Sequence, residues 1–389
     1  MIFFGRLAIK SVTHLMGLFL PIFLYSFFKL SLPLVILYYL SIEVIYALLL
    51  IPGCKNIMNR FGIKKSLQIS TFFGIAYYFA FFLINHYSAN REILSELNQW
   101  WWIMPTVILG IIFRLTHWIP FHTNLAKLTE KNVRASQISL IEATTMALGA
   151  IIPLISGIIL SYFGYDILFL LAAAIYLVSL IPYSLLPEVK EKFTWSWKET
   201  WQKFSSKKMR PIIVAYAGDG AESVAGSIIW PIFIWELLSG NYFQIGALSS
   251  LIIVVTITLQ LTFGAILNRP GRKQKYLRYG AAFYALGWIF KALINSAFHV
   301  FLFSTYHNFS KIFSHTSFDS LNYDIAADQG HYVDEYTVLR ELAVLLGKTV
   351  MSILVLILFP YFSLQHLFVL AALSSLSIAF LKKGISLTL

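Results

Sequence analysis

The sequence predicts an all-α polytopic membrane protein with twelve transmembrane helices in two pseudo-symmetric six-helix halves. Three observations predict this fold class. The 389 residues are 58% hydrophobic and only 12% charged, with a mean hydropathy of +0.72, whereas soluble domains carry roughly a quarter charged residues. Many apolar runs approach the ~20 residues that a helix needs to cross a bilayer. Short motifs of the first half also recur in the second half.

The apolar runs predict helices and not barrel strands. Lipid tolerates only helices or closed barrels, and these runs are long and do not alternate. A small-residue cleavage site is missing after the first run, so we expect a retained span and not a signal peptide. The predicted spans are 7–29, 32–52, 67–86, 101–123, 136–162, 166–187, 211–237, 243–266, 277–296, 298–322, 336–359 and 362–381.

The basic residues predict the orientation of these spans. The net charge is +12, and most Lys and Arg residues fall in every second connection, mainly 53–66, 124–135, 188–210 and 267–278. By the positive-inside rule, both termini are cytoplasmic and the number of spans is even. We therefore expect an integral protein of the cytoplasmic (inner or plasma) membrane and no nucleic-acid partner. A single cysteine, Cys54, excludes an intrachain disulfide.

An internal repeat predicts two domains and a linker. The run "PIFLY" at 21–25 matches "PIFIW" at 231–235, and "NRFGIKK" at 59–65 matches "NRPGRKQ" at 268–274. Further along, Arg114 matches Lys311 and Gly149 matches Gly347, in the same order. The expected domains are an N-terminal six-helix bundle (1–187), a cytoplasmic linker (188–210) and a C-terminal six-helix bundle (211–389).

The linker has its own pattern. Phe193, Trp197, Trp201 and Phe204 follow one another at helical spacing, among more basic than acidic residues. This predicts an amphipathic helix that lies on the inner leaflet and joins the two halves.

The basic turns resemble a known motif. Gly264-Ala-Ile-Leu-Asn268-Arg269-Pro-Gly271-Arg272-Lys273 resembles the G-x-x-x-D-R-x-G-R-K loop of the major facilitator superfamily, and the turn at 59–65 stands at the first of the two places where that loop occurs. The resemblance covers the whole chain in span count and spacing. Two departures stand out: the acidic residue is Asn in both copies, and Lys55 replaces the leading Gly of the first. Glycine in each turn permits a tight reversal between helices.

The resemblance implies a secondary active transporter that works by alternating access, with spans 1, 4, 7 and 10 around a central cavity. It implies a transporter and not an enzyme, and the residues form no catalytic triad, phosphate loop or cofactor motif. We expect a monomer whose partners are a small-molecule substrate, protons and the lipid bilayer.

Ionisable residues within the spans are the candidate site, because each costs a few kcal/mol or more in lipid unless it is paired or hydrated. On span 10, His307, Lys311, His315 and Asp319 follow strict i, i+4 steps, which predicts a polar face toward water or other polar groups. Lys291, at the outer end of span 9, is expected to snorkel and to have no function. His307, His315 and Asp319 offer metal ligands, but Lys311 between them argues against a metal.

Three sets of residues are assigned roles. The substrate-binding set is Arg114, Lys311, Glu222 and His307. The proton-coupling set is Asp219, Glu222, Glu43 and His315. The gating set is Arg60, Arg269, Asp334 and Glu335, in which Arg60 is expected to pair with Asp334 or Glu335 when the inner side is closed.

These assignments favour proton-coupled transport of a small anionic or zwitterionic organic solute. In this hypothesis Arg114 and Lys311 contact the substrate from opposite halves. Two alternatives stay open. One is proton-driven export of lipophilic or cationic compounds, attracted by Asp219 and Glu222; the other is a lipid-handling membrane protein with the same fold.

Overall fold

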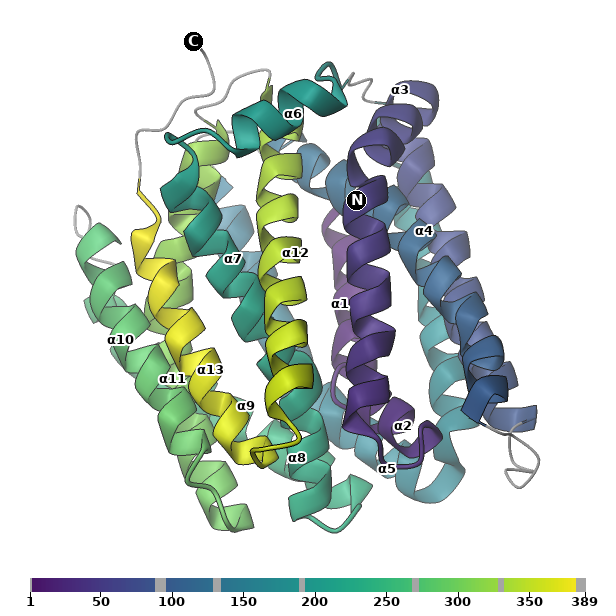
Figure 1. Cartoon of the computed structure of the whole chain (residues 1–389), viewed down its shortest axis with the longest axis vertical. Coiled ribbons are helices and arrows are strands. Elements are labelled where there is room, and N and C mark those ends of the chain that lie inside the picture. Colours follow the sequence, from purple (N-terminus) through teal and green to yellow (C-terminus); the bar gives the residue numbers. More distant parts are fainter. Residues whose placement is uncertain are drawn as a thin grey trace. The chain divides into compact units, whose positions relative to one another are not determined.

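The computed structural model describes residues 2–87, 96–128, 134–188, 193–267, 273–327 and 332–382, and every regular element in these residues is a helix (Figure 1). Two compact units result. The first comprises residues 1–194 with 241–247, and the second comprises 195–240 with 248–389.

The helices of the first unit account for six spans. They are α1 (Ile2–Met16), α2 (Phe19–Phe27), α3 (Leu32–Tyr87), α4 (Glu96–Leu128) and α5 (Arg134–Ser184). α1 and α2 form one span bent by 45°. α3 and α5 each contain two spans that meet at a glycine, Gly62 (φ 69°) and Gly164 (φ 73°). Positive φ is open to glycine at little cost, so the predicted reversal at Gly62 is confirmed, whereas Gly271 lies outside the described residues.

The second unit supplies the other six spans. The bent seventh span is α7 (Arg210–Val224), a π-helical turn (Ala225–Ile229) and α8 (Trp230–Leu237). The remaining spans are α9 (Tyr242–Leu267, whose first residues belong to the first unit), α10 (Lys273–Lys291), α11 (Ala297–Ala327), α12 (Val333–Leu358) and α13 (Leu364–Ser377) with a short 3-10 turn (Ile378–Phe380).

By length and composition, six helices of the described residues are able to cross a membrane, or seven if the bent pair α1–α2 is one span. Two of the six, α3 and α5, each run through two predicted spans. α10 and α11 are not among these helices, since both contain many polar residues. α13 is apolar but shorter. The predicted fold class is confirmed: the helices provide twelve spans in two halves.

The repeat is visible in backbone geometry. At the end of α2, Lys29 and Leu30 have positive φ, and the Leu30 N–H donates to the Tyr25 carbonyl at 2.8 Å. At the end of α8, Ser239 and Gly240 have positive φ, and the Gly240 N–H donates to the Trp235 carbonyl at 2.9 Å. The matching motifs "PIFLY" and "PIFIW" therefore end in the same left-handed cap.

The linker forms a shorter helix than predicted. α6 (Trp197–Phe204) lies across the helix ends at the top of Figure 1, near α7 and α12. Ser196 caps it, because its hydroxyl accepts the Glu199 N–H at 3.2 Å and its backbone is extended. The helical prediction was therefore wrong at Phe193, which lies before the cap and is buried. Trp197 and Trp201 remain exposed, which fits a helix whose apolar face meets the membrane surface.

Asn59 fastens the extended start of this linker to the first unit. Its Nδ2 donates to the Phe193 carbonyl at 3.3 Å, and its Oδ1 accepts the Phe193 N–H at 2.9 Å. A carboxylate has no N–H to donate. Asn59, which stands where the motif has an acidic residue, therefore makes a pair of hydrogen bonds that an aspartate carboxylate cannot make.

Glycines let α7 pack closely against its neighbours. A Cβ on Gly347 of α12 would overlap the carbonyl oxygen of Ala217, and a Cβ on Gly220 would overlap that of Val344. On the α13 side, Gly218 lies against Ser374 and Ser377. α7, which carries Asp219 and Glu222, is therefore held backbone to backbone.

Candidate functional site

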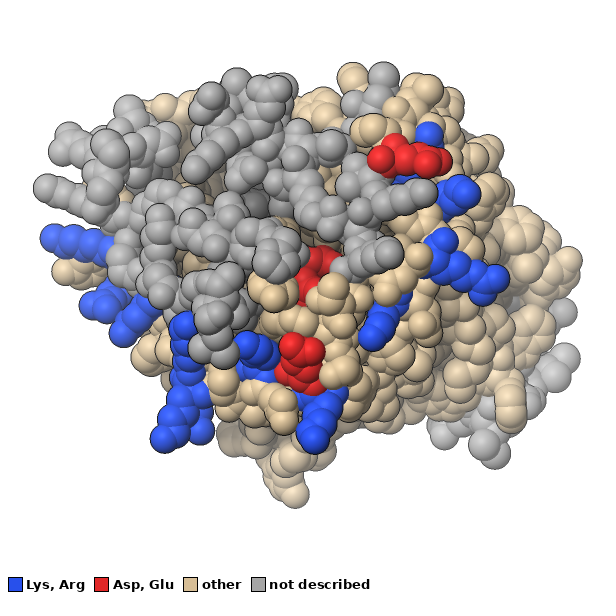
Figure 2. Space-filling view, turned by 90° about the horizontal axis from the view of Figure 1, so that it is seen from above, with Lys and Arg blue, Asp and Glu red and all other residues tan. Residues whose placement is uncertain are grey.

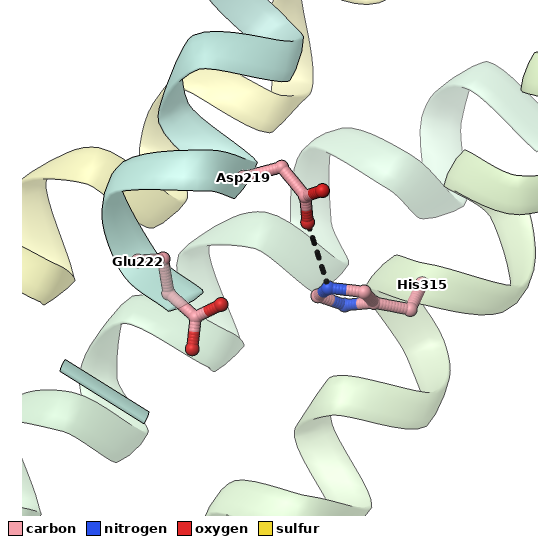
Figure 3. Close-up of side chains that lie close together, drawn as sticks. All are labelled: Asp219, Glu222 and His315. Carbon is pink, nitrogen blue, oxygen red and sulfur yellow. Dashed lines mark ion pairs between the residues drawn. The ribbon is translucent and has the colours of Figure 1, made fainter. Parts of the chain in front are cut away.

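Three ionisable side chains of the second unit lie together. Asp219 and Glu222 project from α7, and His315 reaches them from α11 (Figure 3). His315 Nε2 is 3.4 Å from Asp219 Oδ1, and the two side chains are 18% and 24% exposed. Ser314 Oγ is 3.0 Å from the other ring nitrogen of His315. The structure thus brings together Asp219, Glu222 and His315, which the sequence placed on two different spans.

Glu222 is buried and held by a tyrosine. The Tyr284 hydroxyl on α10 donates to Glu222 Oε1 at 2.6 Å, and Glu222 is 3% exposed. Directly after this stretch of α7 comes the π-helical turn 225–229, an irregularity that often marks functional positions in helices.

His307 also packs against Tyr284. Its ring is 4.6 Å from the Tyr284 ring and 4.6 Å from the Trp288 ring, centroid to centroid. Gly287 leaves room for it, since a Cβ there would lie 2.8 Å from His307 Nδ1. That nitrogen is buried and has no hydrogen-bond partner among the described residues. One ring nitrogen of His307 is therefore unused by the described residues.

The polar face of α11 continues from His307 to Lys311, His315 and Asp319. The Lys311 ammonium lies 5.6 Å from the Tyr284 ring centroid, and its charge acts on Asp219. Lys311 has no ion pair within the part of the chain that the structure describes. Asp319, one turn beyond His315, is exposed.

A second polar group lies nearer the α6 end of the same unit. The Tyr216 hydroxyl bonds to Asn322 Oδ1 and to the Tyr336 hydroxyl, the latter at 2.9 Å. The Arg340 guanidinium lies over the Tyr216 ring at 5.4 Å, and its charge acts on Asp219. Sequence reasoning missed these tyrosines because it searched for ionisable residues; a Tyr hydroxyl within an apolar span is a usable signal, since a buried hydroxyl needs a partner.

The prediction that Lys291 snorkels outward was wrong. Its side chain is 4% exposed, and its ammonium lies 3.9 Å from the Trp230 ring centroid and 4.5 Å from that of Trp288. The reason is helix direction. Side chains tilt toward the N-terminus of their helix, and α10 ends at Lys291. The side chain therefore runs back over Trp288, one turn earlier, and does not snorkel outward.

In the first unit the predicted residues are surrounded by tyrosines. Glu43 is 3% exposed, and Arg114 is half-buried on α4. The charges of both act on the Tyr39 hydroxyl, and that of Arg114 also acts on Tyr77. Tyr38 lies nearby, with its hydroxyl 3.1 Å from Thr106 Oγ1 and 3.3 Å from the Tyr77 hydroxyl. Because Arg114 and Lys311 belong to different units, their common cavity stays a prediction.

The gating residues also stay a prediction. Arg60 is exposed, with its guanidinium 5.5 Å from the Phe61 ring. Asp334 and Glu335 stand in the first turn of α12 and are each 1% exposed. Arg269 lies outside the described residues.

The geometry of Asp219, Glu222 and His315 also suits a metal ion. One ligand atom from each lies within 4.8 Å of the others, and carboxylate and imidazole are ordinary ligands for divalent cations. The sequence considered His315 with His307 and Asp319, and it missed this combination because Asp219 and Glu222 come from another span.

Comparisons with known proteins agree with this fold. The family model of the Major Facilitator Superfamily matches residues 2–304. No curated protein matches the sequence. Among solved structures, a POT family transporter in complex with 5-aminolevulinic acid has a TM-score of 0.66 at 12% identity, covering 97% of this chain and 93% of its own. Peptide transporter POT in complex with sulfate has a TM-score of 0.68 at 13% identity, covering 97% and 92%.

A third solved structure, a bacterial metal transporter, has a TM-score of 0.64 at 15% identity and covers 97% of this chain and 96% of its own. At such identities these structures show the fold alone. The family model spans more than half of the chain, and it agrees with the basic turns and with the repeat. The chain therefore belongs to the Major Facilitator Superfamily, and it is a secondary transporter embedded in a membrane.

Proposed function

We propose that this transporter moves a small anionic or zwitterionic organic solute, coupled to protons, by alternating access. The observation that carries the proposal is a cluster of polar side chains in the second unit. Asp219 pairs with His315, and Glu222 accepts a hydrogen bond from Tyr284. Lys311 lies beside the same tyrosine and has no ion pair among the described residues. Such a group offers both proton acceptors and a positive charge that has no ion pair among the described residues.

The acidic residues are the proposed proton carriers. Glu222 is buried, and the Tyr284 hydroxyl can donate to either form of its carboxyl group. Asp219 pairs with His315 at a partly exposed position. A proton gained by Asp219 would neutralise its carboxylate and weaken this pair. Glu43 is the corresponding candidate of the first unit.

The cations are the proposed substrate contacts. Lys311 and Arg114 each lack an ion pair among the described residues, and a substrate carboxylate would supply it. The comparison structures support this chemistry, since one holds 5-aminolevulinic acid and another holds sulfate. Export of cationic compounds is less well supported, because Lys311 and Lys291 add positive charge beside the two acids.

We also propose that both termini are cytoplasmic and that the chain works as a monomer, with the domains 1–187 and 211–389 joined by 188–210. Figure 2 looks onto the face on which α6 lies, and more Lys and Arg than Asp and Glu side chains stand on it. An excess of basic residues is typical of cytoplasmic ends of spans. Arg60, Arg269, Asp334 and Glu335 remain the proposed gating residues.

Uptake by proteoliposomes tests the proposal. Purified protein is reconstituted with and without an inward proton gradient, and a panel of amino acids, dipeptides, small carboxylates and organic cations is screened. We expect gradient-driven accumulation of at least one carboxylate-bearing solute. Glu222→Gln should abolish that accumulation while leaving part of the solute exchange. Accumulation of organic cations alone would contradict the proposal.

Divalent metal transport is a second candidate, favoured by the ligand atoms of Asp219, Glu222 and His315 within 4.8 Å of one another. Isothermal titration of the purified protein with Mn²⁺ and Zn²⁺ separates the two candidates. Binding that is lost in both Asp219→Asn and His315→Gln, together with metal uptake by proteoliposomes, would support this second function.

A further inference from the structure

Lys291 stands in an aromatic enclosure at the end of α10. Trp230 and Trp288 place their faces 3.9 and 4.5 Å from its ammonium, measured to the ring centroids. Phe368 of α13 packs against both tryptophans, with centroid distances of 5.8 Å to Trp230 and 5.5 Å to Trp288. Both Trp288 and Phe368 are fully buried, and Lys291 is 4% exposed. The ammonium therefore lies over two tryptophan rings, and a third aromatic ring from another span packs behind them.

Backbone and side-chain hydrogen bonds hold the end of α10, which carries Lys291. The Ala292 and Ile294 N–H groups close the end of α10 by bonding to the carbonyls of Trp288 and Lys291, at 3.2 and 3.3 Å. Gln365 of α13 donates its amide to the Ile294 carbonyl. The position of Lys291 therefore does not depend on its own side-chain contacts.

This buried cation has no direct ion pair among the described residues. No carboxylate of the described residues lies within ion-pair distance of Lys291. Glu222 attracts the ammonium and Lys311 repels it, but Glu222 Oε1 already accepts the Tyr284 hydrogen bond. Tryptophan faces and a helix C-terminus favour a cation, yet a desolvated charge without a counter-ion is costly. Among the described residues, no carboxylate is in direct contact with the ammonium of Lys291.

A second unsatisfied group faces the same tryptophan. His307 packs on the Trp288 ring, and its Nδ1 has no hydrogen-bond partner among the described residues. Glu222 also borders this place, since a Cβ built on Gly226 would lie 3.6 Å from Glu222 Oε1 and 3.8 Å from the Trp288 ring. Lys291, His307 and Glu222 are thus grouped around Trp288.

We propose that Lys291 binds the carboxylate of the transported solute, and that the aromatic enclosure of Trp230, Trp288 and Phe368 holds the carbon atoms beside that carboxylate. His307 then bonds to a second polar group of the same solute. The ligand class is a small carboxylate that carries a hydroxyl, amino or carbonyl group close to the acid. This inference rests on the proposed function, and it adds a binding residue to the substrate set of Arg114 and Lys311.

Binding of simple probes tests the site without knowledge of the solute. The full-length protein, purified in detergent, is titrated with benzoate and lactate, and with the uncharged benzamide and lactamide as matched controls. Tryptophan fluorescence and the thermal unfolding temperature report binding. We expect the wild type to bind the carboxylates and not the amides. Lys291→Met should weaken carboxylate binding about tenfold or more, the loss of one charge-assisted hydrogen bond, and Lys291→Arg should restore most of it.

The results decide between binding and a purely structural role. Equal carboxylate affinity in the wild type and a folded Lys291→Met overturns the proposal, and so does equal response of the wild type to acid and amide. If Lys291→Met shows no folded thermal transition, His307→Gln takes its place: it should lower affinity for lactate and leave affinity for benzoate unchanged, and equal effects on the two overturn the proposal.

Transport separates this site from the proposed function. Carboxylate uptake by proteoliposomes that is unchanged in Lys291→Met supports the proposed function and overturns the Lys291 site. Lys291-dependent carboxylate binding without uptake of any carboxylate supports the site and contradicts the proposed function.

Discussion

The phenolic oxygen of Tyr284 lies 2.6 Å from Oε1 of Glu222, so α10 holds the buried acid of α7 directly. The same ring contacts His307 and His315, at centroid distances of 4.6 and 5.1 Å, and the Lys311 ammonium lies 5.6 Å from it. One tyrosine therefore touches or borders four ionisable residues of the second unit. In the proposed function, it is the residue that would pass the effect of a proton on Glu222 to α11.

Removal of the Tyr284 hydroxyl should affect the coupling of uptake to protons more than the packing of the helices. Tyr284→Phe keeps the ring contacts and leaves a buried carboxylate oxygen without its donor, which costs about 1–3 kcal/mol. We expect a lower thermal unfolding temperature and a weaker response of uptake to the proton gradient. Tyr279→Phe, on the exposed face of the same helix, is the matched control and should behave as the wild type. Unfolding and uptake identical to wild type in Tyr284→Phe would contradict the assigned role.

The Asp219–His315 pair should matter for function and little for stability. Both side chains are partly exposed, and such pairs contribute about 0–1 kcal/mol. A double-mutant cycle with Asp219→Asn and His315→Gln measures their coupling through thermal unfolding. We expect a coupling energy below about 1 kcal/mol, with loss of gradient-driven accumulation in each single variant. A large coupling energy with normal accumulation would show a structural pair.

Asn59→Asp tests the linker attachment. The substitution removes the donor to the Phe193 carbonyl and places a carboxylate oxygen against that carbonyl. The expected cost is about 1–2 kcal/mol, from one lost bond and one unsatisfied acceptor. Limited proteolysis should cut the linker faster in this variant. Asn56→Asp, exposed one turn earlier on α3, is the control, and equal cleavage of both variants would argue against the attachment.

The spans and their turns were predictable because they follow from local rules. Length and hydropathy identify a helix that crosses a membrane, and glycine at a reversal predicts the positive φ found at Gly62. The repeat was predictable because "PIFLY" and "PIFIW" end in the same cap, although the sequence alone does not show the backbone angles of Lys29 or Ser239.

The site was predicted only in part, because side-chain direction and partners come from packing. Asp219, Glu222, His307 and His315 were named from their charge in apolar spans. Lys291 was misread, since its position near a span end does not reveal that Trp230, from another helix, covers its ammonium. Tyr284 was missed because a neutral residue carries no sign of its bond to Glu222, which lies on a different span.

The last prediction concerns the packing of α12 against α7, the helix that carries Asp219 and Glu222. Gly347→Ala would push a methyl group into the Ala217 carbonyl, and neither backbone can yield without moving α7 or α12. Overpacking of this kind costs typically about 1–3 kcal/mol, which exceeds the roughly 1 kcal/mol that Ala gains over Gly in a helix. The unfolding temperature should fall, and uptake should fall with it because Asp219 and Glu222 move.

Gly226→Ala is the matched comparison, on the π-helical turn that directly follows α7. Its added methyl group meets its nearest atom at 3.6 Å, which is ordinary contact, so the variant should fold at least as well as the wild type. Thermal unfolding of both variants in one detergent checks the pair. Similar shifts of the unfolding temperature in the two variants would mean that the close approach of α7 and α12 at Gly347 does not limit stability. Other contacts would then hold Asp219 and Glu222 in place.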